Sequence, residues 1–375
     1  MLGLYVHIPF CAAICNYCNF NRGLFDADLA RRYVEALVRE IGLATPAAGR
    51  EQADTIFFGG GTPSLLEPGQ VAVIIDACRT AFDITPDAEV TLEANPETVH
   101  VDALQGYLAA GVTRLSFGVQ SLRNDELVRL SRLHGAERAR QAVREARQAG
   151  VDNLSVDLMM WLPQQDVAQW LESVDGAIAL APEHVSLYML EVYPNAPLRD
   201  AMARARWSQA PDEDAEAMYM EAMDRFERAG LHQYEISNVA RPGRESRHNL
   251  KYWSDGEWLG FGCGAHSTRE GIRWKNVSST VDYIERIAHG GSIRTDVRPL
   301  TPAERIGDAL FTGLRLTQGI DLETVNARYK TDVWSRYGRE LQPFVDEGLL
   351  VHEHARLRLT RRGMLLANEV MAIFV

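Results

Sequence analysis

The chain has 375 residues, 46% of them hydrophobic, with 39 basic against 51 acidic side chains and a formal net charge of −12. This length predicts one large domain with a smaller one, and the acidic balance argues against a general nucleic-acid binder, which needs a basic face. The sequence has no run of 18 apolar residues that would predict a membrane-spanning helix, and its start lacks the regions of a secretory signal, so we expect a cytoplasmic protein with reduced cysteines.

The first 240 residues alternate short apolar runs with longer segments of helical periodicity. The predicted strands are residues 4–8, 55–58, 89–93, 114–119, 153–158 and 184–190. The predicted helices between them are residues 28–43, 67–82, 101–110, 135–150 and 166–180. Strands recurring every 30 to 40 residues or so are typical of βα units and a parallel sheet. Six such strands predict an α/β fold with a partial (β/α)6 barrel of the TIM type, whose active residues gather at the carboxyl ends of the strands.

The middle of the chain is less regular. Residues 211–231 predict a further amphipathic helix, and residues 234–240 follow as a short segment before the next polar stretch. Residues 241–247 read R-P-G-R-E-S-R and predict a loop, and residues 258–266 are apolar and rich in glycine. Residues 292–299 predict a linker.

From Thr301 on, the pattern becomes mostly helical. The predicted helices are residues 302–316, 322–329 and 333–347, followed by a hairpin made of L-L-V-H and R-L-R-L-T and a last helix near Thr360. Helices followed by a two-stranded wing predict a small winged-helix-like domain. We therefore divide the chain into a barrel (1–240), an intermediate segment with a linker (241–299) and a C-terminal domain (300–375).

Three cysteines lie within eight residues, Cys11, Cys15 and Cys18, in C-A-A-I-C-N-Y-C. This spacing lets one loop place three thiolates around a single inorganic centre. A [4Fe–4S] cluster normally takes four cysteines, so three would leave one iron with an exchangeable site. The alternative is a zinc site completed by His7, but the second ligand pair usual in zinc loops is missing. Five cysteines in all, an odd number, disfavour a disulfide framework.

Polar and glycine residues follow the ends of successive predicted strands. G-G-G-T-P (residues 59–63) follows the second strand, and its glycines either form a tight turn or let a ligand approach the backbone. Glu93, Gln120 and Asp157 close the next three strands in L-E-A-N-P, F-G-V-Q-S and V-D-L-M. A carboxylate there could hold an ammonium or hydroxyl group, and Asp157 could accept from ribose hydroxyls. Each is singly explained as a cap or solvated residue, but together, beside the cysteine loop, they predict a ligand site.

The stretch H-N-L-K-Y-W, from His248 to Trp253, has two interpretations. The histidine could ligate a haem iron with the aromatic residues stacked on the porphyrin, or it could belong to a packed aromatic corner, which spacing alone favours. Cys78 lies in an apolar helical stretch and is predicted to be a core thiol, and Cys263 is also predicted to be structural. Met218, Met220 and Met223 are predicted to be core residues.

With these motifs together, the chain resembles the radical S-adenosylmethionine (SAM) enzymes, and within them the group around oxygen-independent coproporphyrinogen III oxidase. The resemblance rests on Y-V-H-I-P-F-C…C…C, F-F-G-G-G-T-P-S, L-E-A-N-P, L-S-F-G-V-Q-S, the aspartate of V-D-L-M and H-N-x-x-Y-W. It covers nearly the whole chain, including a C-terminal region like that group's appended domain.

The resemblance implies that the three cysteines hold a [4Fe–4S] cluster and that SAM binds its open iron, to be cleaved by one electron to a 5′-deoxyadenosyl radical. It implies SAM contacts from Tyr5, Gly60, Gly61, Thr62, Glu93, Gln120, Arg132 and Asp157, with His266 near the adenine side. The chain has Phe20 where the decarboxylating oxidase has a further cysteine, lacks that enzyme's N-terminal extension, and has Asn19 where an aspartate is expected. In the first two of these features the chain resembles the HemW-type proteins, which are regarded as haem chaperones. Those proteins typically have an H-N-x-x-Y-W motif, so the resemblance makes candidate haem contacts of His248, Asn249, Tyr252 and Trp253.

The function expected from this resemblance is a haem chaperone that binds a [4Fe–4S] cluster, SAM and haem. The expected partners are haem, a haem-acceptor protein (with a membrane-associated acceptor left open) and an electron donor for the cluster, with no nucleic acid. Whether SAM is cleaved in function, and so whether the protein is an enzyme, stays open. Two alternatives remain: radical decarboxylation of coproporphyrinogen III to protoporphyrinogen IX, and a non-catalytic zinc or nucleoside-binding module.

Overall fold

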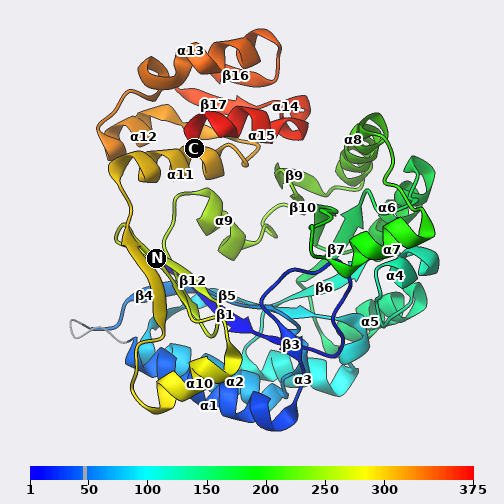
Figure 1. Cartoon of the computed structure of the whole chain (residues 1–375), viewed down its shortest axis with the longest axis vertical. Coiled ribbons are helices and arrows are strands. Elements are labelled where there is room, and N and C mark those ends of the chain that lie inside the picture. The colour runs from blue at the N-terminus through cyan, green and yellow to red at the C-terminus, as the bar shows by residue number, and fades with distance from the viewer. Residues whose placement is uncertain (45–48) are drawn as a thin grey trace.

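The computed structural model describes residues 1–44 and 49–375 and shows a large sheet with helices, and a smaller domain at the C-terminus (Figure 1). The large sheet has twelve strands in the order β14-β13-β12-β11-β1-β4-β5-β6-β7-β8-β10-β9. Its strands are β1 (Leu2–Ile8), β4 (Gln52–Gly60), β5 (Asp83–Ala94), β6 (Arg114–Gln120), β7 (Leu154–Met160), β8 (His184–Met189), β9 (His232–Glu235), β10 (Asn238–Ala240), β11 (Trp258–Phe261), β12 (His266–Arg269), β13 (Ile272–Asn276) and β14 (Arg294–Pro299). A small separate pair, β2 (Phe10–Cys11) and β3 (Gly23–Leu24), flanks the cysteine loop.

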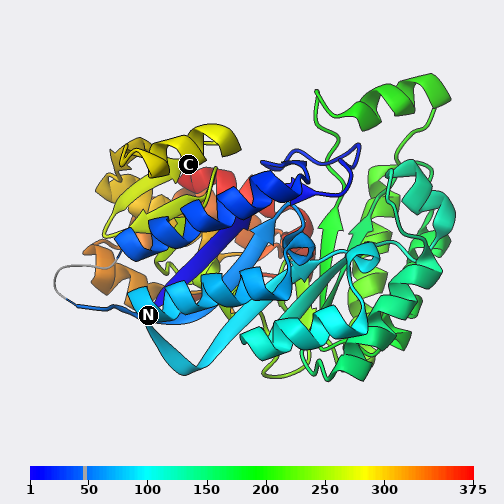
Figure 2. The ribbon, with the colours of Figure 1, turned by 90° about the horizontal axis from the view of Figure 1, so that it is seen from below.

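Six neighbouring strands, β1 and β4 to β8, run parallel, and the helices that connect them cover one face of the sheet. Figure 2 shows α1, α2 and α3, blue to cyan, side by side across that face. The helices of this part are α1 (Ala27–Leu43), α2 (Pro68–Ala81), α3 (Val101–Ala110), α4 (Asn124–Arg129), α5 (Ala136–Ala149), α6 (Val167–Ala179), α7 (Pro197–Ala205), α8 (Asp212–Arg228), α9 (Arg247–Trp253) and α10 (Thr280–Ala288), with short 3-10 turns η1 (Pro63–Leu65) and η2 (Pro96–Thr98).

The predicted α/β fold with a partial barrel is confirmed. All six parallel strands and the five helices between them form at the predicted places, with ends within a few residues of those expected except at the start of β5, which begins at Asp83. Strands buried on both sides are near-continuous apolar runs, which is why they stand out in the sequence. Two of the helices end at glycines that adopt a left-handed conformation, Gly111 at φ 108° and Gly150 at φ 99°.

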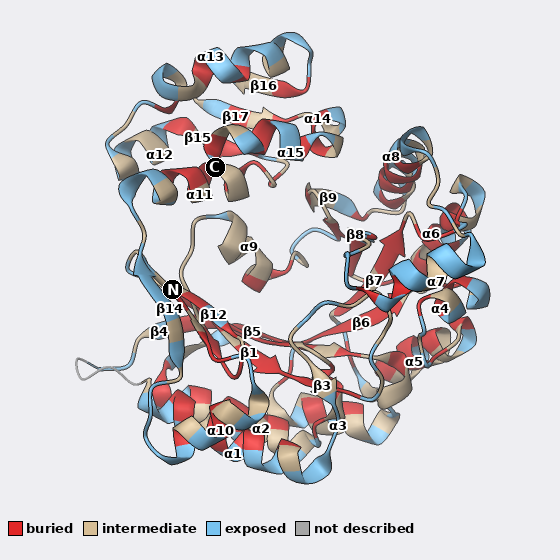
Figure 3. Cartoon of the chain, in the orientation of Figure 1, coloured by how far each residue is buried: buried red, intermediate tan, exposed pale blue. Residues whose placement is uncertain are grey.

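The largest cluster of buried apolar residues forms the core of the sheet region; buried residues are red in Figure 3. On β1, Leu4, Val6 and Ile8 are fully buried against the helices, while Tyr5 and His7 point to the opposite face, because side chains alternate along a strand. We call the face that carries Tyr5 and His7 the inner face. The predicted core residues Cys78 and Cys263, and Met218 and Met223 of the methionine stripe, are buried as expected, with Met220 partly buried against them.

The intermediate part of the chain corrects one prediction. Strand β11 pairs parallel with β1, and β12, β13 and β14 follow antiparallel, so this part extends the large sheet. The linker predicted at residues 292–299 is wrong over Arg294–Pro299, which forms edge strand β14. That strand is almost entirely exposed, so it lacks the apolar alternation by which strands are predicted. Helix α9, with only seven residues and one buried side chain, was also not predicted.

The C-terminal domain has its own core and a three-stranded sheet in the order β15-β17-β16. Its elements are α11 (Pro302–Gly313), β15 (Ile320–Asp321), α12 (Leu322–Tyr329), α13 (Val333–Asp346), β16 (Leu350–Glu353), β17 (Arg356–Leu359), α14 (Arg361–Leu365), α15 (Ala367–Met371) and η3 (Ala372–Phe374). The predicted three helices and two-stranded wing are present. In the part of the chain that the structure describes, no helix is long and apolar enough to cross a bilayer.

Helix α9 lies between the inner face of the sheet and the C-terminal domain (Figure 1). The guanidinium of Arg315, just after α11, lies 4.3 Å from the centre of the Trp253 ring at the end of α9. The same guanidinium pairs with the fully buried carboxylate of Glu235 on β9 at 2.9 Å. One arginine therefore joins the C-terminal domain to both α9 and the far edge of the sheet.

A buried carboxylate holds the sheet extension to helix α1. Glu40 accepts hydrogen bonds from the Gly262 amide (2.7 Å), the Asn276 amide group (2.7 Å) and the Tyr283 hydroxyl (2.5 Å). Burial raises the pKa of Glu40 to about 7, and these three donors only partly oppose the effect.

This pKa predicts a pH-dependent contribution to stability. The folded pKa lies above the unfolded value of 4.5, so the contribution is complete below pH 4.5 and is lost as pH rises through 7. Relative to Glu40→Gln, the wild type should therefore lose stability between pH 5 and pH 8, by about 3 kcal/mol at most. The measurement is the free energy of unfolding in urea at both pH values, with exposed Glu35→Gln on the same helix as control. If the difference in free energy of unfolding between wild type and Glu40→Gln were the same at both pH values, this account would be contradicted.

Candidate functional site

Cys11 ends β2, and Cys15 and Cys18 lie on the irregular loop that connects β2 to β3. The two strands pair in parallel, with Phe10 opposite Gly23 and Cys11 opposite Leu24. Two further backbone bonds close the base of the loop, from the Gly23 amide to the Pro9 carbonyl (2.7 Å) and from the Phe25 amide to the Cys11 carbonyl (2.9 Å). Cys11 is buried and Cys15 and Cys18 are half-buried, and all three are free thiols.

The three thiols influence one another electrostatically. Burial raises the pKa values of Cys11 and Cys18, and the charges of the neighbouring cysteines raise them further. Within residues 1–44 and 49–375, no three His, Cys, Asp or Glu side chains already form a group arranged to hold a metal ion. Three soft thiolates on one loop are a donor set that fits an iron–sulfur cluster with one iron left open.

His7, the fourth ligand of the alternative zinc site, is not free to bind a metal. His7 is buried, its Nε2 donates to the Asn21 carbonyl at 2.8 Å, and its Nδ1 accepts from the Tyr5 hydroxyl at 3.2 Å. Because both ring nitrogens are engaged, His7 has none left for a metal.

The glycine turn after β4 fits against the backbone that leads into the cysteine loop. The Gly61 amide donates to the Ile8 carbonyl at 2.8 Å, and the Thr62 amide donates to the Phe10 carbonyl at 2.7 Å. A Cβ on Gly61 would stand 2.6 Å from the Phe10 carbonyl oxygen, and one on Gly60, at φ 115°, would stand 2.5 Å from the His7 ring. This turn therefore needs residues without side chains.

Two carboxyl groups, Glu93 on β5 and Asp157 on β7, lie on either side of β6 and influence each other electrostatically. Glu93 accepts from the Gly60 amide at 3.1 Å, and Asp157 accepts from the Ser116 hydroxyl at 3.1 Å. Burial raises the pKa of Glu93 to about 8, with the charge of Asp157 as the next cause, and burial also raises the pKa of Asp157. A cationic ligand, with an ammonium or sulfonium group, would offset the free-energy cost of burying these two carboxylates in their ionised form.

Arg132 connects the glycine turn to the cysteine loop. Its Nη2 donates to the Asn95 side-chain oxygen at 2.6 Å and to the Gly118 carbonyl at 2.8 Å, and its Nη1 lies 3.5 Å from the Cys15 sulfur. The Asn95 amide group in turn donates to the Thr62 hydroxyl at 3.1 Å. Five separate stretches of sequence thus meet in one network of hydrogen bonds.

Gln120 ends β6 in a left-handed conformation, at φ 68°. Its side-chain oxygen and the Arg132 Nε are buried without a hydrogen-bond partner among the described residues. Buried polar atoms are nearly always paired, so these two atoms are candidates for contact with a ligand. The sequence reasoning missed Asn95 and Ser116. Asn95 stands two residues after Glu93 in the motif already noted, whereas nothing in the sequence marks Ser116.

In the H-N-x-x-Y-W motif, the histidine is buried and both of its ring nitrogens are hydrogen-bonded. His248 is 1% exposed, with Nδ1 2.8 Å from the Thr55 hydroxyl and Nε2 2.8 Å from the Tyr252 hydroxyl. Its ring stacks on Phe57 at 5.2 Å between centres, and burial lowers its pKa to about 3. This placement favours the packed aromatic corner for His248 and leaves no free ring nitrogen for a haem iron. Asn249 is half-buried on the same helix.

His266 opens β12, two strands away from β1 in the sheet, and is exposed. The structure therefore brings together residues on neighbouring strands and the turns that follow them, with His266 to one side: Tyr5, Gly60, Gly61, Thr62, Glu93, Gln120 and Asp157. Arg132 follows α4 and joins this group through its bonds to Asn95 and Gly118.

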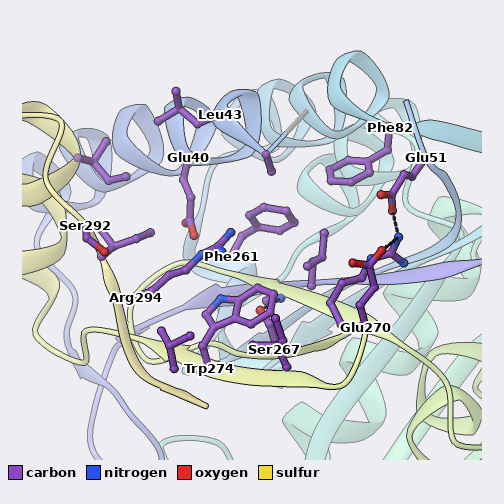
Figure 4. A pocket seen from close by; sticks show the side chains of 18 of the residues that line it. Glu40, Leu43, Glu51, Phe82, Phe261, Ser267, Glu270, Trp274, Ser292 and Arg294 are labelled. Atoms are coloured by element: carbon purple, nitrogen blue, oxygen red, sulfur yellow. Dashed lines mark hydrogen bonds and ion pairs between the residues drawn. The ribbon is translucent and has the colours of Figure 1, made fainter. Parts of the chain in front are cut away.

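A pocket of about 620 Å³ opens on the opposite, helix-covered face of the sheet extension (Figure 4). Glu40, Phe261, Trp274 and Arg294 are among its lining residues, and the Arg294 guanidinium lies 4.4 Å from the centre of the Trp274 ring. None of the residues predicted from the sequence as cluster, SAM or haem contacts lines this pocket.

Comparison with known families gives two matches. A model of the radical SAM superfamily matches residues 5–176, and a model of the HemN C-terminal domain matches residues 300–366. The chain is 36% identical over 376 residues to the heme chaperone HemW of Bacillus subtilis, an alignment that covers 100% of this chain and 99% of that protein. It is 37% identical over 382 residues to the heme chaperone HemW of Mycobacterium tuberculosis, covering 98% and 93%.

Among solved structures, the chain is similar to the coproporphyrinogen III oxidase HemN of Escherichia coli, a radical SAM enzyme. The TM-score is 0.87 at 22% sequence identity, covering 100% of this chain and 89% of that one. At that identity the likeness shows a shared fold.

The contact at the glycine turn yields a direct test. Gly61→Ala should push the turn away from the Phe10 carbonyl, lowering stability by about 1–3 kcal/mol and reducing iron loading. The matched control is Gly69→Ala in α2, where an added Cβ would meet nothing within 4 Å. Melting temperature, and iron and sulfide per chain after anaerobic reconstitution, are the measurements. Wild-type loading of Gly61→Ala would show that this contact does not position the cysteine loop.

Proposed function

Since the chain belongs to the radical SAM superfamily and, within it, to the HemW group, we propose that it is a haem chaperone that binds haem and passes it to an acceptor protein. The proposal rests on the similarity to proteins named heme chaperone, which runs the full length of the chain. Phe20 supports it, because an exposed phenyl ring stands where the decarboxylating oxidase is expected to have a further cysteine.

Cys11, Cys15 and Cys18 would hold a [4Fe–4S] cluster. The loop that carries them is closed at its base by backbone bonds and contacted by Arg132 at Cys15, which favours a fixed position for the three sulfurs. When bound, the cluster supplies an electron for the chemistry of SAM, so an electron-donor protein is a further partner of this proposal.

SAM would lie over the ends of β4 to β7. The glycine turn offers close access to the backbone for its amino-acid part at Gly60, Gly61 and Thr62, and Tyr5 lies beside the turn. The paired carboxyl groups of Glu93 and Asp157 favour a ligand with cationic groups, and Asp157 would accept from the ribose hydroxyls. The unpaired oxygen of Gln120 and Nε of Arg132 would complete the contacts.

Haem is the cargo in this proposal and is expected on the inner face, where α9 presents the H-N-x-x-Y-W motif. Tyr252 and Trp253 would contribute aromatic contacts and Asn249 a polar one. The acceptor would be a haem-requiring protein in the cytoplasm or at a membrane. The alternative function is decarboxylation of coproporphyrinogen III. Only the predicted SAM contacts at the ends of the strands support it.

The experiment is a haem titration of the full chain after anaerobic reconstitution, followed by mixing with a haem-free acceptor cytochrome. We expect one haem per chain and its transfer to the acceptor, read from the Soret bands. In parallel, coproporphyrinogen III is incubated with the protein, SAM and a reductant. Absence of a stable haem complex, or formation of protoporphyrinogen IX, would overturn the chaperone proposal.

The SAM assignment predicts the effect of a single isosteric change. Asp157→Asn keeps the shape and the bond from Ser116 but removes the charge, and should weaken SAM binding by about 1–3 kcal/mol, roughly 5- to 150-fold. The control is Asp152→Asn, whose side chain is 81% exposed just before the same strand. Calorimetry on the reconstituted protein measures both. Wild-type affinity in Asp157→Asn would exclude this carboxylate as a SAM contact.

A further inference from the structure

The haem iron needs a ligand, and the histidine of H-N-x-x-Y-W is engaged elsewhere. His248 has Thr55 on one ring nitrogen and Tyr252 on the other. Three more histidines of the sheet region are engaged in the same way. His7 contacts Tyr5 and Asn21, His134 contacts Glu97 and the Val119 carbonyl, and His184 contacts Ser155 and Tyr234. None of these four rings offers a free nitrogen.

His266 differs from them in being exposed, with no hydrogen bond to its ring among the described residues. The next residue, Ser267, points to the helix-covered face, where it lines the pocket of Figure 4. Because side chains alternate along a strand, His266 points to the inner face, which also carries Tyr5 and the contacts of α9. The charge of His266 also contributes to lowering the pKa of His7, after burial of the His7 ring.

Aromatic residues of the H-N-x-x-Y-W region support the backbone at His266. The Trp258 indole N–H donates to the His266 carbonyl at 3.1 Å. Tyr252 of α9 meets Trp258 edge-on, at 4.7 Å between ring centres and an angle of 90°. Tyr252 of the motif thus supports, through Trp258, the backbone of the strand that carries the free imidazole. The rings of Tyr252 and Trp258 also give the inner face flat aromatic surfaces suited to a macrocycle.

Two basic side chains flank the imidazole on the neighbouring strand. Lys275 pairs in register with His266, and Arg273 pairs with Thr268. Partial desolvation of the ring and these two cations lower the pKa of His266, which keeps the imidazole neutral near pH 7, the form that binds a metal. Haem also carries two carboxylates. Lys275 and Arg273 are paired with Asp296 (2.7 Å) and Asp308 (2.8 Å), so propionates would compete with these aspartates.

We propose that His266 is the axial ligand of the haem iron, with the macrocycle against Trp258 and Tyr252, rather than a contact to the adenine side of SAM. This inference rests on the proposed function, since it names the iron ligand of the same haem site. The step is a coordination. A ring nitrogen donates its lone pair to the iron, no covalent bond of the protein breaks, and the oxidation state of the iron does not change.

The test is a titration of the full chain with haem, read by absorption and electron paramagnetic resonance, in wild type, His266→Ala and His248→Gln. We expect His266→Ala to lose the histidine-ligated spectrum, to bind haem at least tenfold more weakly, and to regain the spectrum when free imidazole is added. His248→Gln should keep the histidine-ligated spectrum. The control is His232→Ala, which removes an exposed histidine from β9 at the other edge of the sheet and should behave as wild type.

The outcomes separate the inference from the function on which it rests. If wild type binds haem and His266→Ala shows the same spectrum and affinity, the ligand assignment is wrong while the chaperone proposal stands. If His248→Gln loses histidine ligation and His266→Ala keeps it, the iron ligand is His248. If the wild type binds no haem, the proposed function fails and the inference fails with it. Equal melting temperatures of the variants exclude misfolding as the cause of any loss.

Discussion

The arrangement of the site depends on how closely two backbones approach where β4 ends beside β1. The amides of Gly61 and Thr62 bond to carbonyls on either side of Pro9, immediately before the first cysteine. The three glycines of the turn face different neighbours, with Gly59 against Tyr5 and Glu93, Gly60 against the His7 ring and Gly61 against the Phe10 carbonyl. A methyl group at Gly60 or Gly61 would meet these neighbours at less than 3 Å, so the loop could not stay against the sheet.

From this turn, polar contacts spread along the strand ends and return to the cysteines. Thr62, Asn95 and Arg132 form a continuous path of hydrogen bonds that ends at the Cys15 sulfur. Glu93 and Asp157 lie beside it, both buried, with raised pKa values that reflect burial and, at Glu93, their mutual repulsion. Buried carboxyl groups with raised pKa values are common at binding sites, because a ligand of opposite charge stabilises their ionised form when it binds. The arrangement is therefore explained better as a site for a cationic ligand than as a stabilising feature of the fold.

The sequence predicts those parts of the molecule that depend on local pattern. The parallel strands are buried runs with helices between them, so their periodicity is plain, and the glycines and carboxylates at their ends can be placed on one edge without coordinates. Strand β14 is almost entirely exposed, and helix α9 has only seven residues, one of them buried and the rest half-buried, so neither shows an apolar pattern from which it could be predicted. The partners of His248 could not be predicted for another reason. Thr55, which bonds its Nδ1, stands 193 residues earlier in what reads as an ordinary strand.

The same long-range pairing gives the H-N-x-x-Y-W helix a structural meaning. His248 fixes α9 to β4 through Thr55 and Phe57, and Tyr252 fixes it to Trp258 on β11. Trp253 at its end lies under Arg315, which also holds Glu235. A seven-residue helix with few bonds of its own is thus held by the sheet on one side and by the C-terminal domain on the other. Removing either set of contacts would free a helix too short to persist alone, so the motif residues are needed for the architecture of the inner face even where they touch no ligand.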